Sequence, residues 1–494
     1  MAVIKNISYF LAASVLSKPF GFLLSFALAK VLGPTDFGVW VTLMLIVSYS
    51  PIAALGTVET LVKQVPFFRG RNESAKIKET EDSVMGSLVL AALFLILLAL
   101  LGLVILPWLN LGLDSVDVSV MLLAVAVSCA SNFFYHRFAA YENFKAVGMM
   151  DLLRSALALI FVGGMAWRWG LRGAAAGYFL HELSMSILLM LFNVRSHGKV
   201  GITFRPVLLS HAVRIGFPIT ILWWSLTLTG TVDRVVLGSL LGPLAVGHYG
   251  LGVSAAGMLG LVPMVVGRVL YPRVNKQIGR NEGANSMQRI VVAPTLALGA
   301  LLANLQLAAL VIMPYLYNQL LPKYQPGLLA GEVLMLGSYF SCLLRNGANY
   351  LIATNLERVF LKYIVVTLVF NVICDVGLLK AGMGLVGVAL GTSLAGLLLT
   401  SLVWYRVLLG LGQQKSKARS TLFALYLPLI LLASAAIVLR ILFPSAFQLF
   451  DLLTLGLGVI LIIILNGLLY CFPIYRNEIK GWMTTALRLL KITA

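Results

Sequence analysis

The sequence predicts an all-α polytopic membrane protein with about fourteen transmembrane helices, arranged as two similar six-helix lobes followed by two C-terminal helices. Its composition supports the membrane class. Of the 494 residues, 60% are hydrophobic and only 11% are charged, and the mean hydropathy is +0.96. A soluble domain carries about 25% charged residues to cover its surface. A motif that occurs twice supports the division into two lobes.

Apolar runs of spanning length follow one another along the whole chain. A helix needs about 20 mostly apolar residues to cross a bilayer, and several runs contain Gly or Pro, which suits helices that line an interior. The predicted helices cover residues 8–32, 38–62, 83–107, 117–139, 149–168, 171–194, 212–241, 245–268, 289–316, 327–350, 360–380, 383–410, 420–443 and 449–472.

The positions of Lys and Arg predict the orientation. With the N-terminus in the cytoplasm, 27 of the 37 Lys and Arg residues fall in cytoplasmic segments, six fall outside and four lie inside predicted helices. Cytoplasmic loops of membrane proteins carry an excess of these residues, so we expect both termini to be cytoplasmic. The same rule accounts for the net charge of +19 without a nucleic-acid partner.

The repeated motif ends an apolar run each time. VLGPTDFGVW spans residues 31–40 and LLGPLAVGHY spans residues 240–249, which is an offset of 209 residues. The tetrapeptide GRNE occurs at 70–73 and again at 279–282, with the same offset. Shared features in one order at a constant offset indicate an internal duplication.

A third pair of segments extends the repeat. GLRGAA at 170–175 matches GLVGVA at 384–389, with an offset of 214. We therefore predict an N-lobe of helices 1–6, a C-lobe of helices 7–12, and a last part with helices 13 and 14 and a basic cytoplasmic tail. Six is an even number, so the lobes have the same orientation, as in parallel-repeat transporters whose substrate site lies between the lobes. The predicted boundaries are 1–205, 206–411 and 412–494.

Three cations inside predicted helices are candidate ligands for an anionic substrate group. Lys18 lies near the middle of the first helix on a face of small and polar residues, and Arg345 lies among Ser and Asn residues of the tenth. Arg234 ends a polar stripe of the seventh helix that begins at Trp223. Ionisable residues within a membrane are costly and face a cavity or a partner. Directed at one cavity, Lys18, Arg234 and Arg345 would suit a diphosphate, although an inter-helix ion pair is an equal alternative for Arg234.

Acidic residues inside the helices are candidates for coupling or for ion pairing. Glu182 in the sixth helix could take up a proton or a cation, or could pair with a buried base. Asp233 and Asp375 are the other candidate cavity acids. Adjacent residues on a helix point about 100° apart, so we do not expect Asp233 to pair with Arg234. We expect Arg154 to pair with Asp151, three residues earlier.

Other features of the sequence predict no catalysis. There is no Walker loop, HExxH, GxSxG or metal-ligand cluster, so we expect neither an enzyme nor a cofactor or metal. The four cysteines lie in apolar runs without CxxC spacing. Glu59 is expected at the inner membrane interface. The basic segments 63–82, 268–289 and 473–494 are expected to be amphipathic or solvated parts of the cytoplasmic face.

Several of these motifs together resemble a known family. LGPTDFGVW after the first helix, Ala54-Leu55-Gly56 in the second, Asp233-Arg234 before LLGPLAVGHY, and GLVGVALGTSL at the start of the twelfth are similar to bacterial polysaccharide transporters. These are the Wzx-type O-antigen and exopolysaccharide flippases of the multidrug/oligosaccharidyl-lipid/polysaccharide flippase superfamily. The resemblance covers residues 1–410.

This resemblance implies a fold and a function. It implies a V-shaped pair of six-helix bundles in the bacterial cytoplasmic (inner) membrane. Such a protein moves undecaprenyl-diphosphate-linked oligosaccharide units across this membrane for surface polysaccharide biosynthesis. It does so by alternating access, through a cationic central cavity. The implied partners are the lipid-linked oligosaccharide, membrane lipids, and the polymerase and chain-length proteins of a glycan export pathway. Similar proteins leave two alternatives open: a lipid II-type flippase and a drug/cation antiporter of the same superfamily. The antiporters carry an acid in the first helix, where this chain has Lys18.

Overall fold

The computed structural model describes residues 2–109, 112–261, 284–442 and 464–469, together with a few residues between 263 and 274 and residue 472. These residues are almost entirely helical and contain no strand, which confirms the predicted all-α class. In the described part of the chain, nine helical stretches are long and apolar enough to cross a membrane. The total of fourteen helices stays a prediction.

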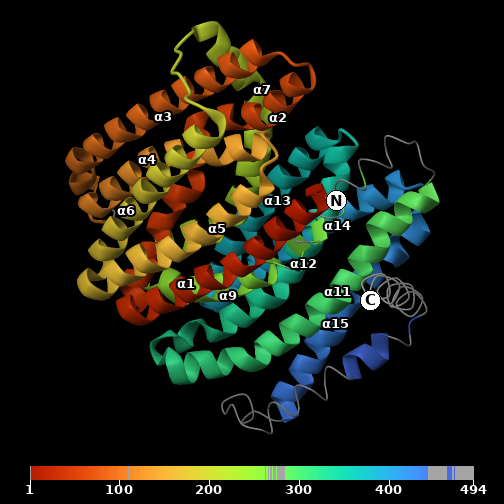
Figure 1. The fold of residues 1–494 in the computed structure, drawn as a ribbon. Helices are drawn as coiled ribbons and strands as arrows, with labels where there is room; N and C mark the ends of the chain where they lie inside the picture. The colour runs from red at the N-terminus through yellow and green to blue at the C-terminus, as the bar shows by residue number, and fades with distance from the viewer. Residues whose placement is uncertain are drawn as a thin grey trace. The chain divides into compact units, whose positions relative to one another are not determined.

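The chain divides into two compact units, Met1–Gly250 and Leu251–Ala494 (Figure 1). The lobe boundary at 205/206 rests on the sequence repeat and also stays a prediction. The first unit contains α1 (Ala2–Tyr49), η1 (Ser50–Ala54), α2 (Thr57–Gly70), α3 (Ser74–Leu109), α4 (Ser115–Ala140), α5 (Phe144–Ala158), η2 (Leu159–Gly163), α6 (Gly164–His197), α7 (Pro206–Thr229), α8 (Val232–Leu240) and the start of α9 (Pro243–Leu259).

Glycines mark several of the predicted helix boundaries. The φ angles of Gly33, Gly170 and Gly382 are 74°, 62° and 84°, in the left-handed region that only Gly adopts readily. Gly33 lies inside α1, between the predicted helices 8–32 and 38–62, and Gly170 lies inside α6 between two others. At Gly33 and Gly170 two helices therefore meet at a residue with a non-helical backbone, at the places where the sequence predicts one helix to end and the next to begin.

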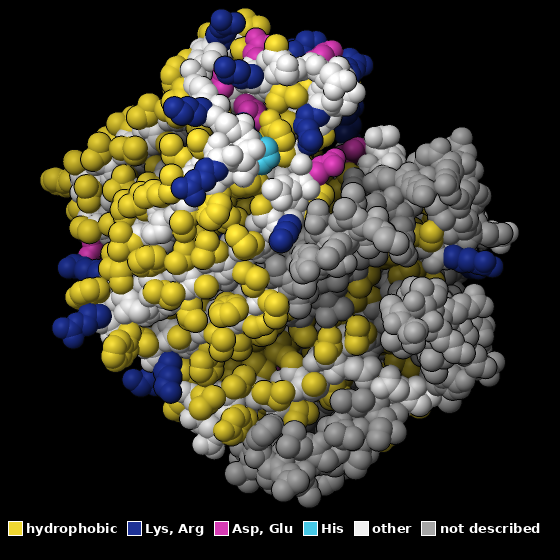
Figure 2. Space-filling model, viewed as in Figure 1, with side chains coloured by type: hydrophobic (Ala, Val, Ile, Leu, Met, Phe, Trp, Pro, Cys, Tyr) yellow, Lys and Arg dark blue, Asp and Glu magenta, His cyan; other side chains and the backbone are white. Residues whose placement is uncertain are grey.

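The helices of the first unit pack around one apolar core. α3, α4 and α6 lie side by side, α5 packs on α1, and α7 packs on α2 and α3 (Figure 1). The core includes Leu61 of α2, Leu88 of α3, Phe133 and Phe138 of α4, and Met185 of α6, all at most 2% exposed. Hydrophobic side chains cover the outer face of these helices (Figure 2), as a lipid-facing surface requires.

The two copies of the repeated motif contact each other inside the first unit. A Cβ on Gly38 would meet the carbonyl oxygen of Pro243, and a Cβ on Gly247 would meet the carbonyl oxygen of Pro34. Gly38 and Pro34 belong to the first copy, and Gly247 and Pro243 are the equivalent residues 209 positions later. The conserved spacing of Pro and Gly within each copy thus allows a backbone-to-backbone contact between α1 and α9 that no side chain could permit.

Three predicted cytoplasmic loops of the first unit meet at one end. Arg137, at the end of α4, is 2% exposed and pairs with Glu81 of α3, which is 5% exposed. The guanidinium also donates to Asn193 and to the carbonyls of His197 and Gly198. The three loops lie at residues 63–82, 136–148 and 195–214, so the structure brings parts of all three together, and their cytoplasmic side stays a prediction.

An ion pair links α4 and α6 at the predicted outer side. Asp114 caps α4 by accepting a hydrogen bond from the backbone N–H of Val116, and Arg172 lies 3.0 Å from its carboxylate. The bond from Val116 and the nearby guanidinium lower the pKa of Asp114. Both partners of this pair are exposed, with 38% and 74% of the side-chain surface accessible. It contrasts with the buried pair of Arg137.

The second unit contains helices that pack mainly on α14. α12 and α13 pack on α14, and α11 packs on α12 and α15. The side chains of Thr367, Asn371 and Asp375 follow one face of α13 and are fully buried. The elements are α11 (Ala284–Tyr315), η3 (Leu316–Leu320), η4 (Pro322–Gly327), α12 (Leu328–Ala353), α13 (Glu357–Leu378), η5 (Leu379–Met383), α14 (Gly384–Gly410) and α15 (Lys415–Leu442).

Candidate functional site

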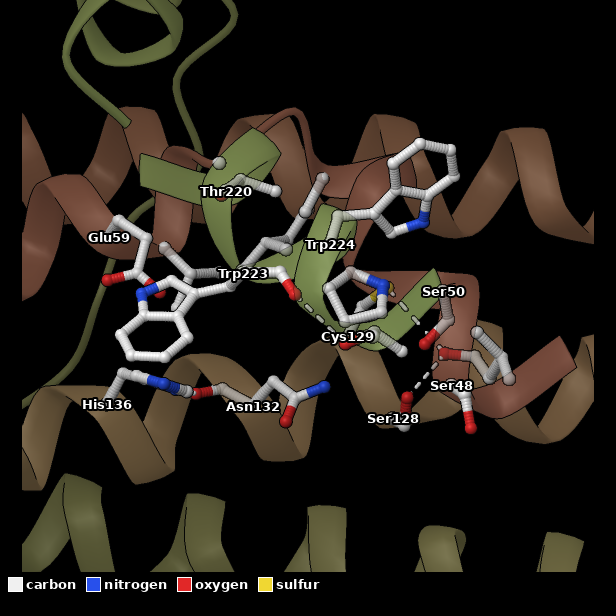
Figure 3. Close-up of a pocket in the computed structure, with 17 residues that line it drawn as sticks. Ser48, Ser50, Glu59, Ser128, Cys129, Asn132, His136, Thr220, Trp223 and Trp224 are labelled. Carbon is white, nitrogen blue, oxygen red and sulfur yellow. Dashed lines mark hydrogen bonds between the residues drawn. The ribbon is translucent and has the colours of Figure 1, made fainter. Parts of the chain in front are cut away.

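A polar cavity opens among the spanning helices of the first unit. Its volume is about 240 Å³, and it lies between the end of α1 with η1, the start of α2, the middle of α4 and the middle of α7 (Figure 3). The lining residues are Ser48, Ser50, Pro51, Ala54, Gly56, Val58, Glu59, Leu88, Val125, Ser128, Cys129, Asn132, His136, Thr220, Trp223, Trp224 and Thr227. Apolar walls with a few polar groups are typical of ligand sites.

A break in the helical backbone creates one wall of the cavity. α1 ends in the short 3₁₀ segment η1, in which Pro51 is near the start, and Leu55 and Gly56 follow with φ angles of 47° and 79°. The chain then re-enters a helix at Thr57, which places Glu59 in the first turn of α2. The sequence PIAALG therefore turns the chain and directs an acidic side chain to the cavity.

Close backbone packing positions α7 on the opposite wall. Gly56 and Gly216 are in backbone contact, so a Cβ on either residue would clash with the other. Next to this contact, the Thr60 hydroxyl donates a 2.7 Å hydrogen bond to the carbonyl of Ala212. These contacts hold α7 against α2 and thereby fix where Trp223 and Trp224, two turns further along α7, lie in the cavity.

The polar groups occupy two ends of the cavity. Glu59, His136 and the indole of Trp223 lie at one end, and Ser48, Ser50 and Ser128 lie at the other (Figure 3). The hydroxyls of Ser48, Ser50 and Ser128 donate to backbone carbonyls of their own helices, at 3.0, 2.8 and 2.7 Å. Because a hydroxyl also has two acceptor lone pairs, these residues still present acceptors to a ligand.

The end with the acid has unused hydrogen-bonding groups. The side chains of Glu59 and Asn132 make no hydrogen bond within the described part of the chain. His136 uses Nδ1 at 2.8 Å from the backbone oxygen of Asn132 and interacts electrostatically with Glu59. Unfilled polar groups among spanning helices are costly unless water or a ligand satisfies them. This end is therefore suited to a hydroxyl-rich ligand.

The two tryptophans offer aromatic surface to the same space. The Trp223 side chain is 48% exposed, whereas Trp224 packs edge-on against Tyr49 with ring centroids 6.3 Å apart. The Trp224 indole N–H is buried without a partner among the described residues. Tyr49 in turn hydrogen-bonds Thr231 at 2.7 Å. Trp223 and Thr227, from the polar stripe that the sequence indicated in this helix, both line the cavity.

Neither Arg234 nor Arg345 is among the described residues that line this cavity. The Lys18 side chain lies outside the described residues, although its backbone belongs to α1. Arg345 is exposed on α12 of the second unit, where its Cδ would lie 3.2 Å from a Cβ on Gly267. Arg234 lies on α8 of the first unit. The joint cavity of Lys18, Arg234 and Arg345 thus remains a prediction.

The expectation that Asp233 and Arg234 do not pair is wrong. Arg234 Nε lies 3.5 Å from Asp233 Oδ1, and the Arg234 guanidinium also donates to the carbonyl of Gly230. The predicted helix 212–241 ends at Gly230, and a new helix begins at Val232, so the two residues lie in the first turn of α8. Long side chains at a helix start can bend back toward the terminus. The other oxygen of Asp233 accepts from Tyr249 at 2.9 Å.

The expected pair between Arg154 and Asp151 is also wrong. Arg154 lies 3.6 Å from Glu182, which is 1% exposed, and donates to Ser131, which in turn donates to Glu182 at 3.1 Å. Asp151 instead accepts a hydrogen bond from Tyr135. Packing of α5 against α6 places the longer-range acid closer to Arg154 than the acid on its own helix. Glu182 is therefore a buried ion-pair partner of Arg154.

Asp375 is buried in the second unit. Its carboxylate lies against Gly391 of α14, at a point where a Cβ would clash with it. Among the described residues, no group of three or more His, Cys, Asp and Glu side chains could hold a metal ion. The role of Asp375 as a coupling acid stays a prediction.

Most of the cavity lining is not predicted from the sequence. Glu59 is expected at the membrane interface, and no prediction concerns Asn132, His136 or Trp224. A signal was available for Glu59, because Pro51 and Gly56 interrupt the apolar run just before it, and broken helices mark binding sites in transporters. For Asn132 and His136, the i and i+4 spacing on α4 was the available signal.

Comparisons with known proteins agree with the membrane fold. Residues 3–277 match the family model described as polysaccharide biosynthesis protein, which is more than half of the chain. A curated relative from Shigella flexneri, named "Putative O-antigen transporter", is 23% identical over 327 residues, which cover 62% of this chain and 76% of the relative.

Solved structures show the same fold at low identity. A lipid II flippase, MurJ in an inward closed conformation, is 14% identical with a TM-score of 0.63, over 93% of this chain and 98% of that one. A multidrug resistance MATE family transporter of the MOP superfamily, in an inward-facing conformation, is 14% identical with a TM-score of 0.60, over 86% and 98%. These structures show the fold, and the match of the family model over more than half of the chain gives the assignment: this chain belongs to the polysaccharide biosynthesis protein family.

Proposed function

We propose that the protein is a flippase that moves undecaprenyl-diphosphate-linked oligosaccharide units from the cytoplasmic to the periplasmic side of the bacterial inner membrane. The observation that carries the proposal is the family match over residues 3–277. The O-antigen transporter from Shigella flexneri supports the substrate class. The fold shared with MurJ, solved in an inward closed conformation, and with a MATE transporter, solved in an inward-facing one, is consistent with alternating access.

The polar cavity of the first unit is consistent with this function. It provides a place for a hydrophilic group among helices whose outer surfaces are apolar. A lipid-linked sugar needs such a place, because its head group cannot cross the hydrocarbon region unaided. The lipid tail needs none. The proposal keeps Lys18 and Arg345 as ligands of the diphosphate, with Arg234 in a supporting role because Asp233 already binds it.

A transport assay tests the proposal. Purified protein in proteoliposomes is expected to move an undecaprenyl-diphosphate-linked oligosaccharide between leaflets. Lys18→Ala and Arg345→Ala are each expected to slow transport by about ten- to a hundredfold, because a lost charge-assisted contact removes roughly 1.5–3 kcal/mol. Lys380→Ala is the matched control, since Lys380 is an exposed residue of η5 at the predicted outer side. Normal transport by both variants would refute the cationic cavity.

One observation favours a second candidate, a drug/cation antiporter. Glu59 brings a carboxylate to the cavity, and none of the lining residues that the structure describes is Lys or Arg, an arrangement that also suits a lipophilic cation. Export of ethidium in the same proteoliposomes, without movement of the lipid-linked oligosaccharide, would favour this alternative.

Reporter fusions at residues 75 and 275 provide a separate check of the parallel repeat, since both residues are expected in the cytoplasm.

A further inference from the structure

We propose that the cavity of the first unit binds a neutral sugar ring of the lipid-linked substrate, and that it excludes both the diphosphate and acidic sugars. This inference rests on the proposed function and adds which part of the substrate the cavity recognises. Trp223 supplies the aromatic surface, and Glu59 and Asn132 supply the hydrogen bonds. The diphosphate and the lipid bind elsewhere.

The size of the cavity suits one ring. Its volume of about 240 Å³ is just below the range of roughly 300–1,000 Å³ for pockets that enclose drug-sized ligands. A whole oligosaccharide does not fit into this space. One sugar of the chain can enter, and the remaining sugars must lie outside, so the cavity would read a single position of the glycan.

The polar groups match the hydroxyls of a sugar. Neighbouring hydroxyls on a ring each offer a donor and acceptors. Glu59 accepts through two oxygens, and the Asn132 carboxamide both donates and accepts. Both side chains are without hydrogen-bond partners in the described chain and line the same cavity. The serine hydroxyls at the other end present further acceptors. A bound ring would satisfy groups that the protein leaves unfilled.

The indole of Trp223 matches the other side of a sugar. A pyranose ring has an apolar face made of C–H groups, which packs on an aromatic ring. Trp223 is 48% exposed and lies at the same end of the cavity as Glu59 (Figure 3). Large rigid aromatic rings give contact area at low entropic cost. An aromatic face beside unfilled acceptors and an amide is the combination that a carbohydrate requires.

The charges of the cavity argue against an anionic group. The described residues that line it include Glu59 but no Lys or Arg. The charge of Arg154 acts on His136, but the Arg154 guanidinium is engaged by Glu182 and Ser131. A phosphate or a sugar carboxylate placed beside Glu59 would face a like charge, and no Lys or Arg among the described lining residues would offset it. A neutral hexose meets no such penalty.

Binding measurements on the full chain in lipid nanodiscs test this inference. The probes are undecaprenyl diphosphate, the same lipid carrying one glucose, and the same lipid carrying one glucuronic acid. The wild type is expected to bind the glucosyl lipid about tenfold more tightly than the glucuronyl lipid, because like charges in a cavity repel. Glu59→Gln is expected to bring the two affinities within about twofold of each other, because it removes that charge and keeps the shape.

The tryptophan is tested with the same probes. Trp223→Ala is expected to weaken binding of the glucosyl lipid about tenfold, and Trp223→Phe to restore most of it, because the aromatic contact carries the effect. Trp167→Ala is the matched control, since Trp167 is 80% exposed and does not line the cavity. Unchanged binding of bare undecaprenyl diphosphate shows that each variant is folded.

The outcomes separate the two proposals. If no lipid-linked probe binds or is transported, the proposed function fails. If the probes are transported but Glu59→Gln leaves the preference unchanged, or Trp223→Ala binds the glucosyl lipid normally, the sugar site is refuted while the flippase stands. Tighter binding of the glucuronyl lipid by the wild type would also refute the sugar site.

Discussion

Two polar regions of the first unit use similar side chains in opposite ways. One region, which we call the clamp, lies at the end of the first unit where the basic loops meet and consists of Arg137, Glu81, Asn193 and the carbonyls of residues 197 and 198. All five N–H donors of Arg137 form hydrogen bonds there, at 2.9–3.0 Å. In the cavity, Glu59 and Asn132 have no such partners among the described residues. Burial of both regions is costly unless their polar groups are satisfied.

The difference indicates which region is structural and which is available to a ligand. In the clamp, the protein itself supplies every partner, so its contribution is to hold α3, α4 and α6 together. In the cavity, the partners must come from water or from a substrate. Polar residues alone therefore do not identify a binding site in this fold. Their unfilled hydrogen-bonding capacity does.

The largest expected effect concerns the clamp. Arg137→Met leaves Glu81 buried without its cation, which is expected to lower the free energy of unfolding by about 3–5 kcal/mol. Thermal unfolding of the detergent-solubilised protein measures this change. Arg172→Met provides the control, since its pair with Asp114 is exposed and contributes at most about 1 kcal/mol. Similar losses in the two variants would show that burial does not distinguish the pairs.

A smaller effect is expected at the contact that fixes the cavity wall. Gly216→Ala places a Cβ against the carbonyl oxygen of Gly56, and overpacking of this kind costs about 1–3 kcal/mol. Because α7 must shift from α2, binding of the glucosyl lipid should weaken as well. Gly21→Ala on α1 is the control, since no atom lies within 4 Å of a Cβ there. A Gly216→Ala protein with wild-type stability and binding would show that the close contact does not fix the wall.

The smallest effect is expected at the exposed pair of Asp114 and Arg172. The pKa of Asp114 is lowered in the folded protein from its ordinary value of 3.8, so the pair stabilises the fold above that pH and loses its contribution as the pH falls below it. Asp114→Asn retains the helix cap, so the loss at pH 7 should not exceed about 0.5 kcal/mol after screening. Unfolding temperatures of both proteins, compared at pH 7 and pH 3, are expected to converge at pH 3. A gap that widens at pH 3 would reverse this sign.

Much of the helical fold could be predicted from local properties of the sequence. The length of each apolar run predicts a helix that can cross the membrane. Glycines with positive φ lie where two predicted helices meet, as at Gly33 and Gly170. The gathering of the basic loops at one end also followed from counting Lys and Arg along the chain. These properties depend on the chain near each residue and need no knowledge of tertiary contacts.

The site depended on tertiary contacts and could be predicted only in part. Arg154 has Asp151 within reach on its own helix, yet Glu182 from α6 is its partner, because helix packing decides between them. The sequence places Glu59 near the inner membrane interface. The turn at Leu55 and Gly56, which brings Glu59 to the cavity, is visible only in the folded backbone. Of the predicted polar stripe, only Trp223 and Thr227 line the cavity. These two could be predicted because they lie on the same face of one helix.

The contact between the two copies of the repeated motif has the geometry of a symmetric dimer. Gly38 contacts Pro243, and the equivalent residue Gly247 contacts Pro34. The Gly of each copy therefore contacts the Pro of the other copy. Such reciprocal contacts define an isologous interface. An ancestral chain of half the length could have formed this contact with a second copy of itself. Gene fusion would then have converted an intermolecular interface into an internal one, and both glycines would have been retained because each copy still needs the other's backbone at close range.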